Sequence, residues 1–292
     1  MEGFLMAIDL EKLMALRVVK PHTYTPKDVM LYALGLGVGA DPMSERQLSF
    51  VYERNLKVLP TFGGVMGYPA FWPRDRPELG LTWKMLLNGE QGIRIHRPLP
   101  TEGDVVGTMV IDRVIDKGPG KGMIMHLHRD VTDAKTGELL LTVENTGMFR
   151  GDGGFGGPTE KSAAPKALPD RQPDLVFDWP VLPQAALIYR LSGDYNPVHS
   201  DPAIAKEGGF DRPILHGAAS WGIAGYALLE ALCEGDPSRF KYFHARFTTP
   251  AYPGEAQRTH IWRIGPGEAA FRVVGADRGK TILDYGTFSY ST

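Results

Sequence analysis

Hydrophobic positions along the chain follow two different periods. Between Gly217 and Leu232, small and apolar residues occupy nearly every side of a helical wheel, which predicts a helix buried on most of its circumference. Residues 244–265, 269–277 and 280–291 alternate apolar with polar positions or are rich in β-branched and aromatic residues, as antiparallel strands are. Residues 104–118, 122–133 and 137–149 do the same. We expect each half to contain one long helix followed by strands, an α+β fold in which a curled sheet encloses a helix.

The two halves of the sequence repeat each other in order and spacing. Residues 24–37 resemble residues 182–194, with Tyr32 matching Tyr189. Residues 55–72 parallel 211–229, and residues 96–106 parallel 246–256. Because similar segments recur in the same order, we predict a duplicated domain whose two halves pack their sheets edge to edge.

Glycine and proline concentrate in residues 151–182, which show little periodicity and are long for a single connection. We predict that this segment is a linker between a first domain, residues 1–150, and a second, residues 183–292. The glycine cluster at its start lacks the Gly-Lys-Ser/Thr ending of a phosphate-binding loop. Turn material is therefore the expected role of that cluster.

The composition indicates a small-molecule partner. Lys and Arg number 32 against 34 Asp and Glu, so no net basic field exists to attract nucleic acid. The single Cys233 cannot form an internal disulfide, and no apolar run reaches the roughly 18 residues of a membrane span. The chain ends Ser289-Tyr290-Ser291-Thr292, which is not a peroxisomal address. We expect a cytoplasmic protein without a membrane or nucleic-acid partner.

Candidate chemistry is concentrated in one short turn of the second half. Within six positions the chain places Asp194, Asn196 and His199, and the corresponding turn of the first half, residues 35–42, lacks this combination of acid, amide and imidazole. The predicted buried helix begins at Gly217, eighteen positions after His199, and the Gly217 N–H can approach a ligand closely at the positive end of the helix. An acid, an imidazole and an oxyanion donor are thus available together.

These residues carry a resemblance to a known family. Residues 193–202, GDYNPVHSDP, followed by residues 209–217, GFDRPILHG, resemble the Gly-Asp-x-Asn-Pro-x-His signature of the MaoC-like dehydratases, in particular the (R)-specific 2-enoyl-CoA hydratases of the second type. Residues 32–37, 58–64, 88–91, 115–120 and 245–255 also resemble the duplicated members. The resemblance implies two tandem hot-dog domains, each an antiparallel sheet wrapped around a central helix, with catalytic groups only in the second.

For function, the resemblance implies reversible hydration of trans-2-enoyl-CoA to (R)-3-hydroxyacyl-CoA in fatty acyl-CoA metabolism. Asp194 and His199 would hold and activate the water and move the protons, Asn196 would orient one of them, and the Gly217 N–H would meet the oxyanion. The residues implied at the coenzyme A part are Asn88, Gly89, Lys117, Phe247, Gly217 and the turn Asp194, Tyr195, Asn196, Pro197, Val198 and His199. Asn88 stands where the family commonly has histidine, so only a backbone contact is expected to survive there.

Other conspicuous side chains have simpler interpretations. His126 and His128 alternate on one strand face without a third ligand at metal-binding spacing, so we expect a solvated or packed pair. His216 is expected to pack against or cap the start of the helix. The set Phe62, Tyr68, Phe71 and Trp72 is either core or, given that the family's first-half helix borders the acyl tunnel, part of the acyl site.

No metal and no redox cofactor is expected, coenzyme A entering only as the thioester of the substrate, and a homodimer is possible. Two alternative functions remain at this point. A hot-dog acyl-CoA thioesterase would use the same helix start to hold a thioester oxygen, and a non-catalytic acyl-CoA-binding subunit would need no acid–base pair. The presence of Asp194 and His199 argues against the second.

Overall fold

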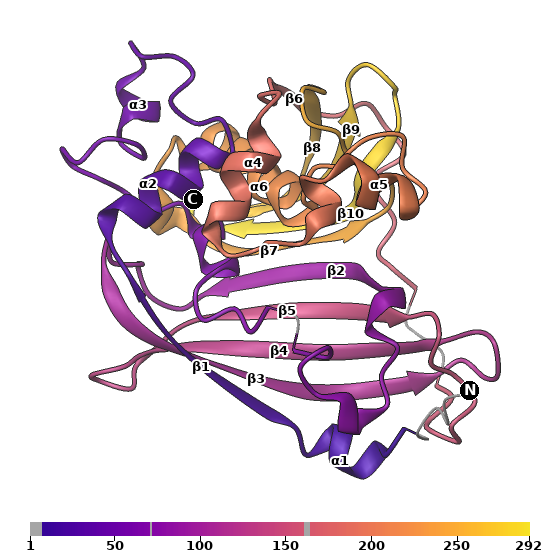
Figure 1. Ribbon diagram of the computed structural model, residues 1–292. Coiled ribbons are helices and arrows are strands. Elements are labelled where there is room, and N and C mark those ends of the chain that lie inside the picture. Colours follow the sequence, from indigo (N-terminus) through magenta and orange to yellow (C-terminus); the bar gives the residue numbers. More distant parts are fainter. Residues whose placement is uncertain (1–7, 71, 161–163) are drawn as a thin grey trace.

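The computed structural model describes residues 8–70, 72–160 and 164–292. Its strands form one ten-stranded antiparallel sheet in the order β1-β3-β4-β5-β2-β7-β10-β9-β8-β6 (Figure 1). The strands of the first half are β1 (Arg17–Tyr24), β2 (Leu86–Ile95), β3 (Gly103–Asp116), β4 (Met123–Asp133) and β5 (Leu139–Phe149). Those of the second half are β6 (Leu175–Trp179), β7 (Phe240–Phe247), β8 (Gln257–Gly265), β9 (Glu268–Gly275) and β10 (Thr281–Tyr290).

The helices are short, with one exception. They are α1 (Leu10–Met14), α2 (Pro26–Gly35), α3 (Glu45–Leu48), α4 (Ala185–Tyr189), α5 (Pro202–Glu207) and α6 (Gly217–Cys233). Short 3₁₀ turns are η1 (Pro60–Gly64), η2 (Pro77–Leu79), η3 (Trp83–Met85), η4 (Arg190–Ser192), η5 (Pro197–His199) and η6 (Pro237–Arg239). None of the described helices is long and apolar enough to cross a membrane.

The two halves meet edge to edge, as the repeated sequence predicts. Strand β2 pairs antiparallel with β7 in a register that sets Glu90 opposite Arg246. An ion pair of 2.6 Å between the Arg246 guanidinium and the Glu90 carboxylate joins the two strands. Helices α2 and α4 also lie side by side, and the rings of Tyr32 and Tyr189 contact with centroids 5.7 Å apart. The strand pair β2 and β7 and the helix pair α2 and α4 thus each join one element of the first half to its counterpart in the second.

Helix α6 is the buried helix that the periodicity predicts, and it begins at Gly217 as expected. Thirteen of its 17 residues are buried, and Trp221 has no exposed surface. Two glycines allow close contacts: a Cβ at Gly225 would lie 2.4 Å from Thr61 Cγ2, and one at Gly222 would lie 2.8 Å from the Tyr32 hydroxyl. First-half residues therefore pack directly onto the second-half helix.

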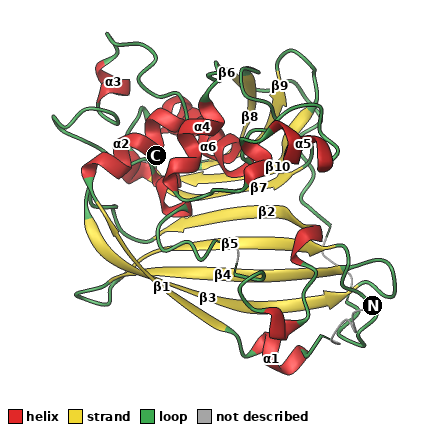
Figure 2. Cartoon of the chain, in the orientation of Figure 1, coloured by secondary structure: helices red, strands yellow, loops and turns green. Residues whose placement is uncertain are grey.

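The expectation of a long central helix in the first half is wrong. In residues 55–72, which parallel the α6 region, the described residues form only the 3₁₀ turn η1. The reason is local: glycines and a proline lower helix propensity, and a Cβ at Gly63 would lie 2.4 Å from Leu141 on the sheet. The segment lies directly on the sheet, too close for a helix of ordinary diameter. Figure 2 shows helices gathered over the second-half strands and loops over most of the first.

The predicted linker also requires a correction, because part of it is a strand. Residues 175–179 form β6, which pairs with β8 and closes one edge of the sheet. Trp179 is 6% exposed and its indole N–H donates to the Leu36 carbonyl at 2.8 Å, so β6 also contacts the first half. Five residues flanked by prolines are too few to show a strand period in the sequence. The other described residues of this segment form loops without helix or strand.

Candidate active site

A sharp turn between α4 and α5 carries the predicted acid and imidazole. Gly193 has a φ of 118°, a conformation that strongly favours glycine, and it redirects the chain after η4. The Asp194 carboxylate accepts from the Asn196 N–H at 3.2 Å, and the Asn196 side-chain oxygen caps η5 by accepting from the Val198 N–H at 3.2 Å. Asn196 therefore shapes the turn that presents His199.

His199 is held as a neutral imidazole with one nitrogen free. The side chain is 8% exposed, and Nδ1 lies 3.0 Å from the carbonyl oxygen of Ile214. A carbonyl can only accept, so Nδ1 carries the proton and Nε2 keeps its lone pair. Burial lowers the pKa of His199 below its usual value, with the charge of Asp194 opposing this effect. At neutral pH the ring is a base with its acceptor nitrogen available.

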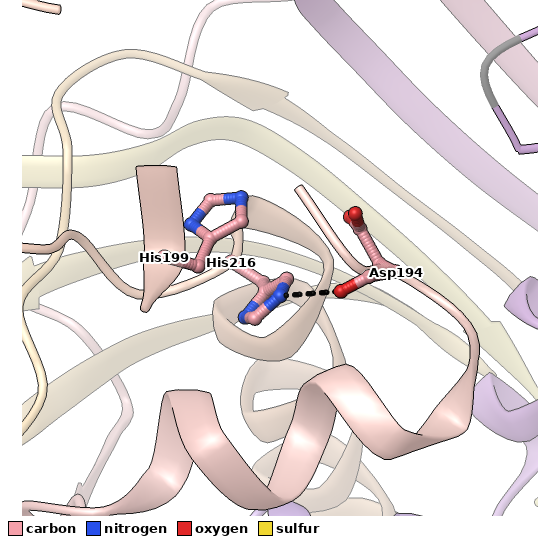
Figure 3. Close-up of side chains that lie close together, drawn as sticks. All are labelled: Asp194, His199 and His216. Atoms are coloured by element: carbon pink, nitrogen blue, oxygen red, sulfur yellow. Dashed lines mark hydrogen bonds between the residues drawn. The ribbon is translucent and has the colours of Figure 1, made fainter. Parts of the chain in front are cut away.

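His216 packs against His199 and the backbone of Asp194 and does not cap the helix. It occupies the N-cap position of α6 without a side-chain capping bond, and its Nε2–H donates to the Asp194 carbonyl at 3.1 Å (Figure 3). Its ring stacks on His199 with centroids 3.8 Å apart. Burial and the nearby His199 lower the pKa of His216 to about 3. Of the two roles expected for His216, packing is the one the structure supports.

Potential metal ligands among the described residues come together at the same place. One ligand atom each from Asp194, His199 and His216 lie within 4.8 Å of one another, and this is the sole group of three or more found in the described ranges. The His216 nitrogen beside Asp194 already donates to a backbone carbonyl, so it has no lone pair to offer an ion there. The other ring nitrogen of His216, Nδ1, is buried and has no hydrogen-bond partner.

Gly217 and Phe247 meet at the start of α6. A Cβ on Gly217 would lie 3.2 Å from Cε1 of Phe247, the last residue of β7, so the aromatic ring covers the first turn. As the first helical residue, Gly217 has an N–H that no carbonyl within the helix can reach. This N–H lies at the positive end of the helix dipole, where a developing negative charge is stabilised.

Asn88 and Gly89 form an irregularity in β2 close to that helix start. The register with β5 passes from Asn88 opposite Gly147 to Glu90 opposite Thr146, which leaves Gly89 as a bulge. Glu90 is paired with Arg246, so the bulge lies beside the end of β7 that carries Phe247. Asn88 is exposed. The structure thus brings these first-half residues near the second-half site.

Lys117 is exposed and lies farther away, beyond the end of β3. Four strand steps separate β3 from β7, which corresponds to on the order of 15–20 Å along the sheet. Sequence reasoning missed its neighbour Asp116, which is 4% exposed and accepts from one backbone N–H in the turn after β3 and three in the glycine cluster of the predicted linker. The donors are Gly118, Gly154, Gly156 and Gly157, at 2.8, 2.7, 3.0 and 3.3 Å. The sequence signal available for this contact was an acid next to Lys117 together with a cluster of glycines later in the chain.

The outer side of the turn that carries Asp194 and His199 is open to solvent. Tyr195 is 55% exposed and its ring lies under the guanidinium of Arg190, 4.9 Å away. Pro197 is exposed, and Val198 is partly buried with its carbonyl accepting from the Ile214 N–H at 3.4 Å. The predicted turn residues therefore form two groups. Asp194 and His199 are the more buried, and Tyr195 and Pro197 form an outer rim that a large ligand can reach.

The fold and the site together define a class. Two hot-dog halves share one sheet, only the second encloses a long helix, and one carboxylate and one neutral imidazole lie at the start of that helix. A double hot-dog protein with a single acid–histidine centre is the class that these features describe.

Comparison with known proteins identifies the family. A model described as the MFE-2 hydratase 2 N-terminal domain matches residues 22–151, and one described as the MaoC like domain matches residues 164–283. The chain is 40% identical to the 3-hydroxyacyl-thioester dehydratase Y of Mycobacterium tuberculosis, over 98% of this chain and 99% of that protein. It is 38% identical to the peroxisomal enoyl-CoA hydratase 2 of Arabidopsis thaliana, over 90% and 89% of the respective chains.

A solved structure of a MaoC-like dehydratase from Phytophthora capsici superimposes with a TM-score of 0.83 at 32% identity, covering 98% of this chain and 99% of that one. The chain belongs to the MaoC-like dehydratase family, in the duplicated form that pairs an MFE-2 hydratase 2 N-terminal domain with a MaoC-like domain.

Proposed function

We propose that the protein reversibly hydrates trans-2-enoyl-CoA to (R)-3-hydroxyacyl-CoA in fatty acid metabolism. The observation that carries this proposal is the free Nε2 of neutral His199 beside the Asp194 carboxylate, at the start of a helix whose Gly217 N–H is unbonded within the helix. The names of the relatives from Mycobacterium tuberculosis and Arabidopsis thaliana, a 3-hydroxyacyl-thioester dehydratase and an enoyl-CoA hydratase, support it.

The chemistry follows from the geometry of these groups. Water between Asp194 and His199 gives one proton to this pair while its oxygen forms a bond to C3 of the enoyl thioester. The pair then passes a proton to C2, so that H and OH are added across the double bond and the pair regains its starting protonation. Negative charge that develops on the thioester oxygen is met by the Gly217 N–H, a contribution typically worth roughly 3 to 4 kcal/mol in such sites. The positioned acid–base pair adds about 10²- to 10⁴-fold in rate. Dehydration is the reverse of these steps.

The coenzyme A part extends across both halves in this proposal. The bulge at Asn88 and Gly89 and the ring of Phe247 lie near the start of α6, where the thioester must be held. Tyr195, Pro197 and Val198 form the adjacent rim, and exposed Lys117 lies on the order of 15–20 Å along the sheet, within reach of a phosphate at the far end of an extended coenzyme. A backbone contact at Asn88 does not depend on its side chain.

Cofactors, compartment and assembly complete the proposal. Acid–base groups supply every step above, so neither a metal nor a redox cofactor is required. We place the protein in the cytoplasm, since its one cysteine, Cys233, is buried and unpaired. A homodimer is proposed on the exposed apolar side chains of Leu187 and Leu191, which follow one another at helical spacing beside the site. Light scattering tests the assembly.

A single assay separates the proposed function from its rivals. The protein is mixed with crotonyl-CoA and with trans-2-decenoyl-CoA, and loss of the enoyl thioester absorbance, product chirality and free thiol are followed together. Hydration predicts loss of absorbance, (R)-3-hydroxyacyl-CoA and no thiol, unchanged after treatment with a chelator. Thiol release would identify a thioesterase, and binding without turnover would identify an acyl-CoA-binding subunit; either result would refute the hydratase.

A further inference from the structure

His216 contacts both groups that the proposed function assigns to proton transfer. Its Nε2–H donates to the main-chain carbonyl of Asp194 at 3.1 Å (Figure 3), and its ring stacks on the His199 ring with centroids 3.8 Å apart and 28° between the planes. His199 is also fixed by the bond from its Nδ1 to the Ile214 carbonyl at 3.0 Å. One side chain thus touches the backbone of the acid and the face of the imidazole at once.

The backbone of His216 belongs to the start of the buried helix. It occupies the N-cap position of α6 and is 1% exposed. Its carbonyl accepts from the N–H groups of Ala219 and Ser220 at 3.0 and 3.2 Å, as the first turn of the helix requires. The turn that carries Asp194 and His199 is open to solvent on its outer side. On its inner side, His216 therefore fastens this turn to the helix.

A line of aromatic rings continues from His216 into the first half. Tyr189 of α4 contacts His216 with ring centroids 5.0 Å apart, and Tyr32 of α2 contacts Tyr189 at 5.7 Å. Phe62 of η1 contacts Tyr32 at 5.5 Å. Tyr32, Phe62 and Tyr189 are each at most 2% exposed. Because close-packed buried rings cannot move separately without opening voids, the first-half core helps to fix the position of the His216 ring.

His216 is uncharged in this arrangement. Its Nδ1 is buried and has no hydrogen-bond partner, so a proton there would find no acceptor. Burial, His199 and Arg190 lower the pKa of His216 to about 3, while the bond to the Asp194 carbonyl opposes this effect. When His199 takes a proton from water, its new positive charge therefore faces a neutral ring and not a second cation.

We propose that His216 is a positioning residue that holds Asp194 and His199 in one geometry for proton transfer. It acts through these two groups and transfers no proton itself. The rings of Tyr189 and Tyr32 hold His216 in turn, so the first half supports the chemistry without supplying a catalytic group. This assignment rests on the proposed hydration. It accounts for a histidine at an N-cap position where its side chain makes no capping bond.

Two substitutions separate the two contacts of His216. His216→Phe keeps a ring against His199 and removes the donor to the Asp194 carbonyl, whereas His216→Gln keeps a donor and removes the ring. With crotonyl-CoA, each should lower kcat roughly tenfold and change KM much less, a size typical of one lost contact in a buried site. The matched control is His260→Gln in β8, where the ring contacts Trp262. It should leave kcat and KM within about twofold of wild type, because His260 touches neither catalytic group.

The titration of His199 distinguishes positioning from a general loss of packing. Burial lowers the pKa of His199, with the charge of Asp194 opposing this effect, and His216→Gln uncovers one face of the ring. The pKa of His199, followed by NMR of the imidazole, should therefore rise toward its usual value in His216→Gln and stay low in His216→Phe. Because only neutral His199 accepts a proton, the acid limb of kcat/KM should move to higher pH in His216→Gln alone.

Substitutions at Tyr189 test the support from the line of rings. Tyr189→Leu should lower kcat as His216→Phe does, and Tyr189→Phe, which keeps the ring, should recover most of that loss. Wild-type kcat in both His216 variants, or an unchanged pKa of His199 in His216→Gln, would overturn the proposal. If Tyr189→Leu does not fold, the His216 variants decide the matter. Wild type that fails to hydrate crotonyl-CoA would refute the proposed hydration instead, and the NMR titration would still show whether His216 holds His199.

Discussion

The two turns that follow α2 and α4 occupy equivalent places and differ in what surrounds them. After α2 the chain passes through Gly37, with a φ of 85°, and a Cβ there would lie 3.3 Å from the indole nitrogen of Trp179 in β6. After α4 it passes through Gly193, whose added Cβ would meet nothing within 4 Å. The first turn is filled by a second-half tryptophan and the second is open. One copy of the duplicated turn serves packing, and the other is free to hold a substrate.

The segments that follow these two turns along the chain also differ between the halves. In the second half they form α6, with Gly217 at its start, and in the first half the short turn η1. A Cβ at Gly64 would lie 3.5 Å from Trp221 of α6, so η1 fits between the first-half sheet and the second-half helix. Among the described residues, the first-half segment that corresponds to the start of α6 therefore offers no helix start at which an oxyanion could be held.

The largest effect is expected where the two turns differ most. Asp194→Ala and His199→Ala should each lower the hydration rate by about 10³-fold, within the range for positioned acid–base groups, because each removes a proton-transfer partner. Stopped assays with crotonyl-CoA at high enzyme concentration measure this. The double variant should be little worse than either single, as groups of one unit behave.

A matched control is Asp41→Ala, which removes the acid of the first-half turn, where Asp41 accepts from the Met43 N–H at 2.9 Å. Its rate should remain within twofold of wild type. Activity within tenfold of wild type in either Asp194→Ala or His199→Ala would contradict the assignment of chemistry to the second turn.

The helix start is expected to give the next largest effect. Gly217→Val places a branched side chain where even a Cβ lies 3.2 Å from Phe247, so we expect the ring to move and the N–H to be displaced from the oxygen. We expect kcat to fall roughly 10²-fold, since the lost interaction acts mainly in the transition state. Steady-state kinetics and binding of butyryl-CoA measure the two effects, and binding should weaken less. Ala218→Ser, one residue further on, serves as the mild control; a wild-type rate in Gly217→Val would mean that the oxygen is held elsewhere.

The sequence predicted the parts of this comparison that have a local signal. The strands, the edge-to-edge halves and α6 follow from periodicity and repetition, and the candidate catalytic turn follows from Gly193, Asp194 and His199 in one short stretch. The family resemblance, confirmed by the comparisons, supplied the fold name and the reaction.

The remainder depends on contacts between distant residues. The first-half helix was wrongly predicted because the repeat aligns apolar residues while Gly63 and Gly67 decide how closely the segment approaches the sheet. Strand β6 is too short to show a period within a proline-rich segment. The contact of Arg129 with Tyr68 joins β4 to the loop after η1, and nothing in the sequence near either residue indicates the other. Such pairings appear only after the sheet has formed.

A smaller effect is expected from the contact between η1 and α6. Gly225→Ala would place a Cβ 2.4 Å from Thr61 Cγ2 in a buried contact, which should lower the free energy of unfolding by about 1–3 kcal/mol, as overpacking typically does. Urea denaturation measures it. Thr61→Ser removes the opposing methyl group, so the double variant should be more stable than the sum of the single effects implies. Strict additivity would show that the two segments do not touch.

The smallest effect concerns the pH dependence of stability at His216, a residue with no counterpart in the first-half turn. Burial holds the pKa of His216 to about 3 in the folded protein, below the usual value of 6.5. Between these values the unfolded chain binds a proton that the folded protein does not, so stability falls as the pH drops through this window, by up to about 1.4 kcal/mol per pH unit. His216→Gln keeps a donor for the Asp194 carbonyl and removes the titration. Urea denaturation at pH 7 and pH 5.5 should show a decrease smaller by about 1 kcal/mol in the variant than in wild type. Equal decreases would mean that His216 titrates alike in both states and is not held neutral by its burial against His199.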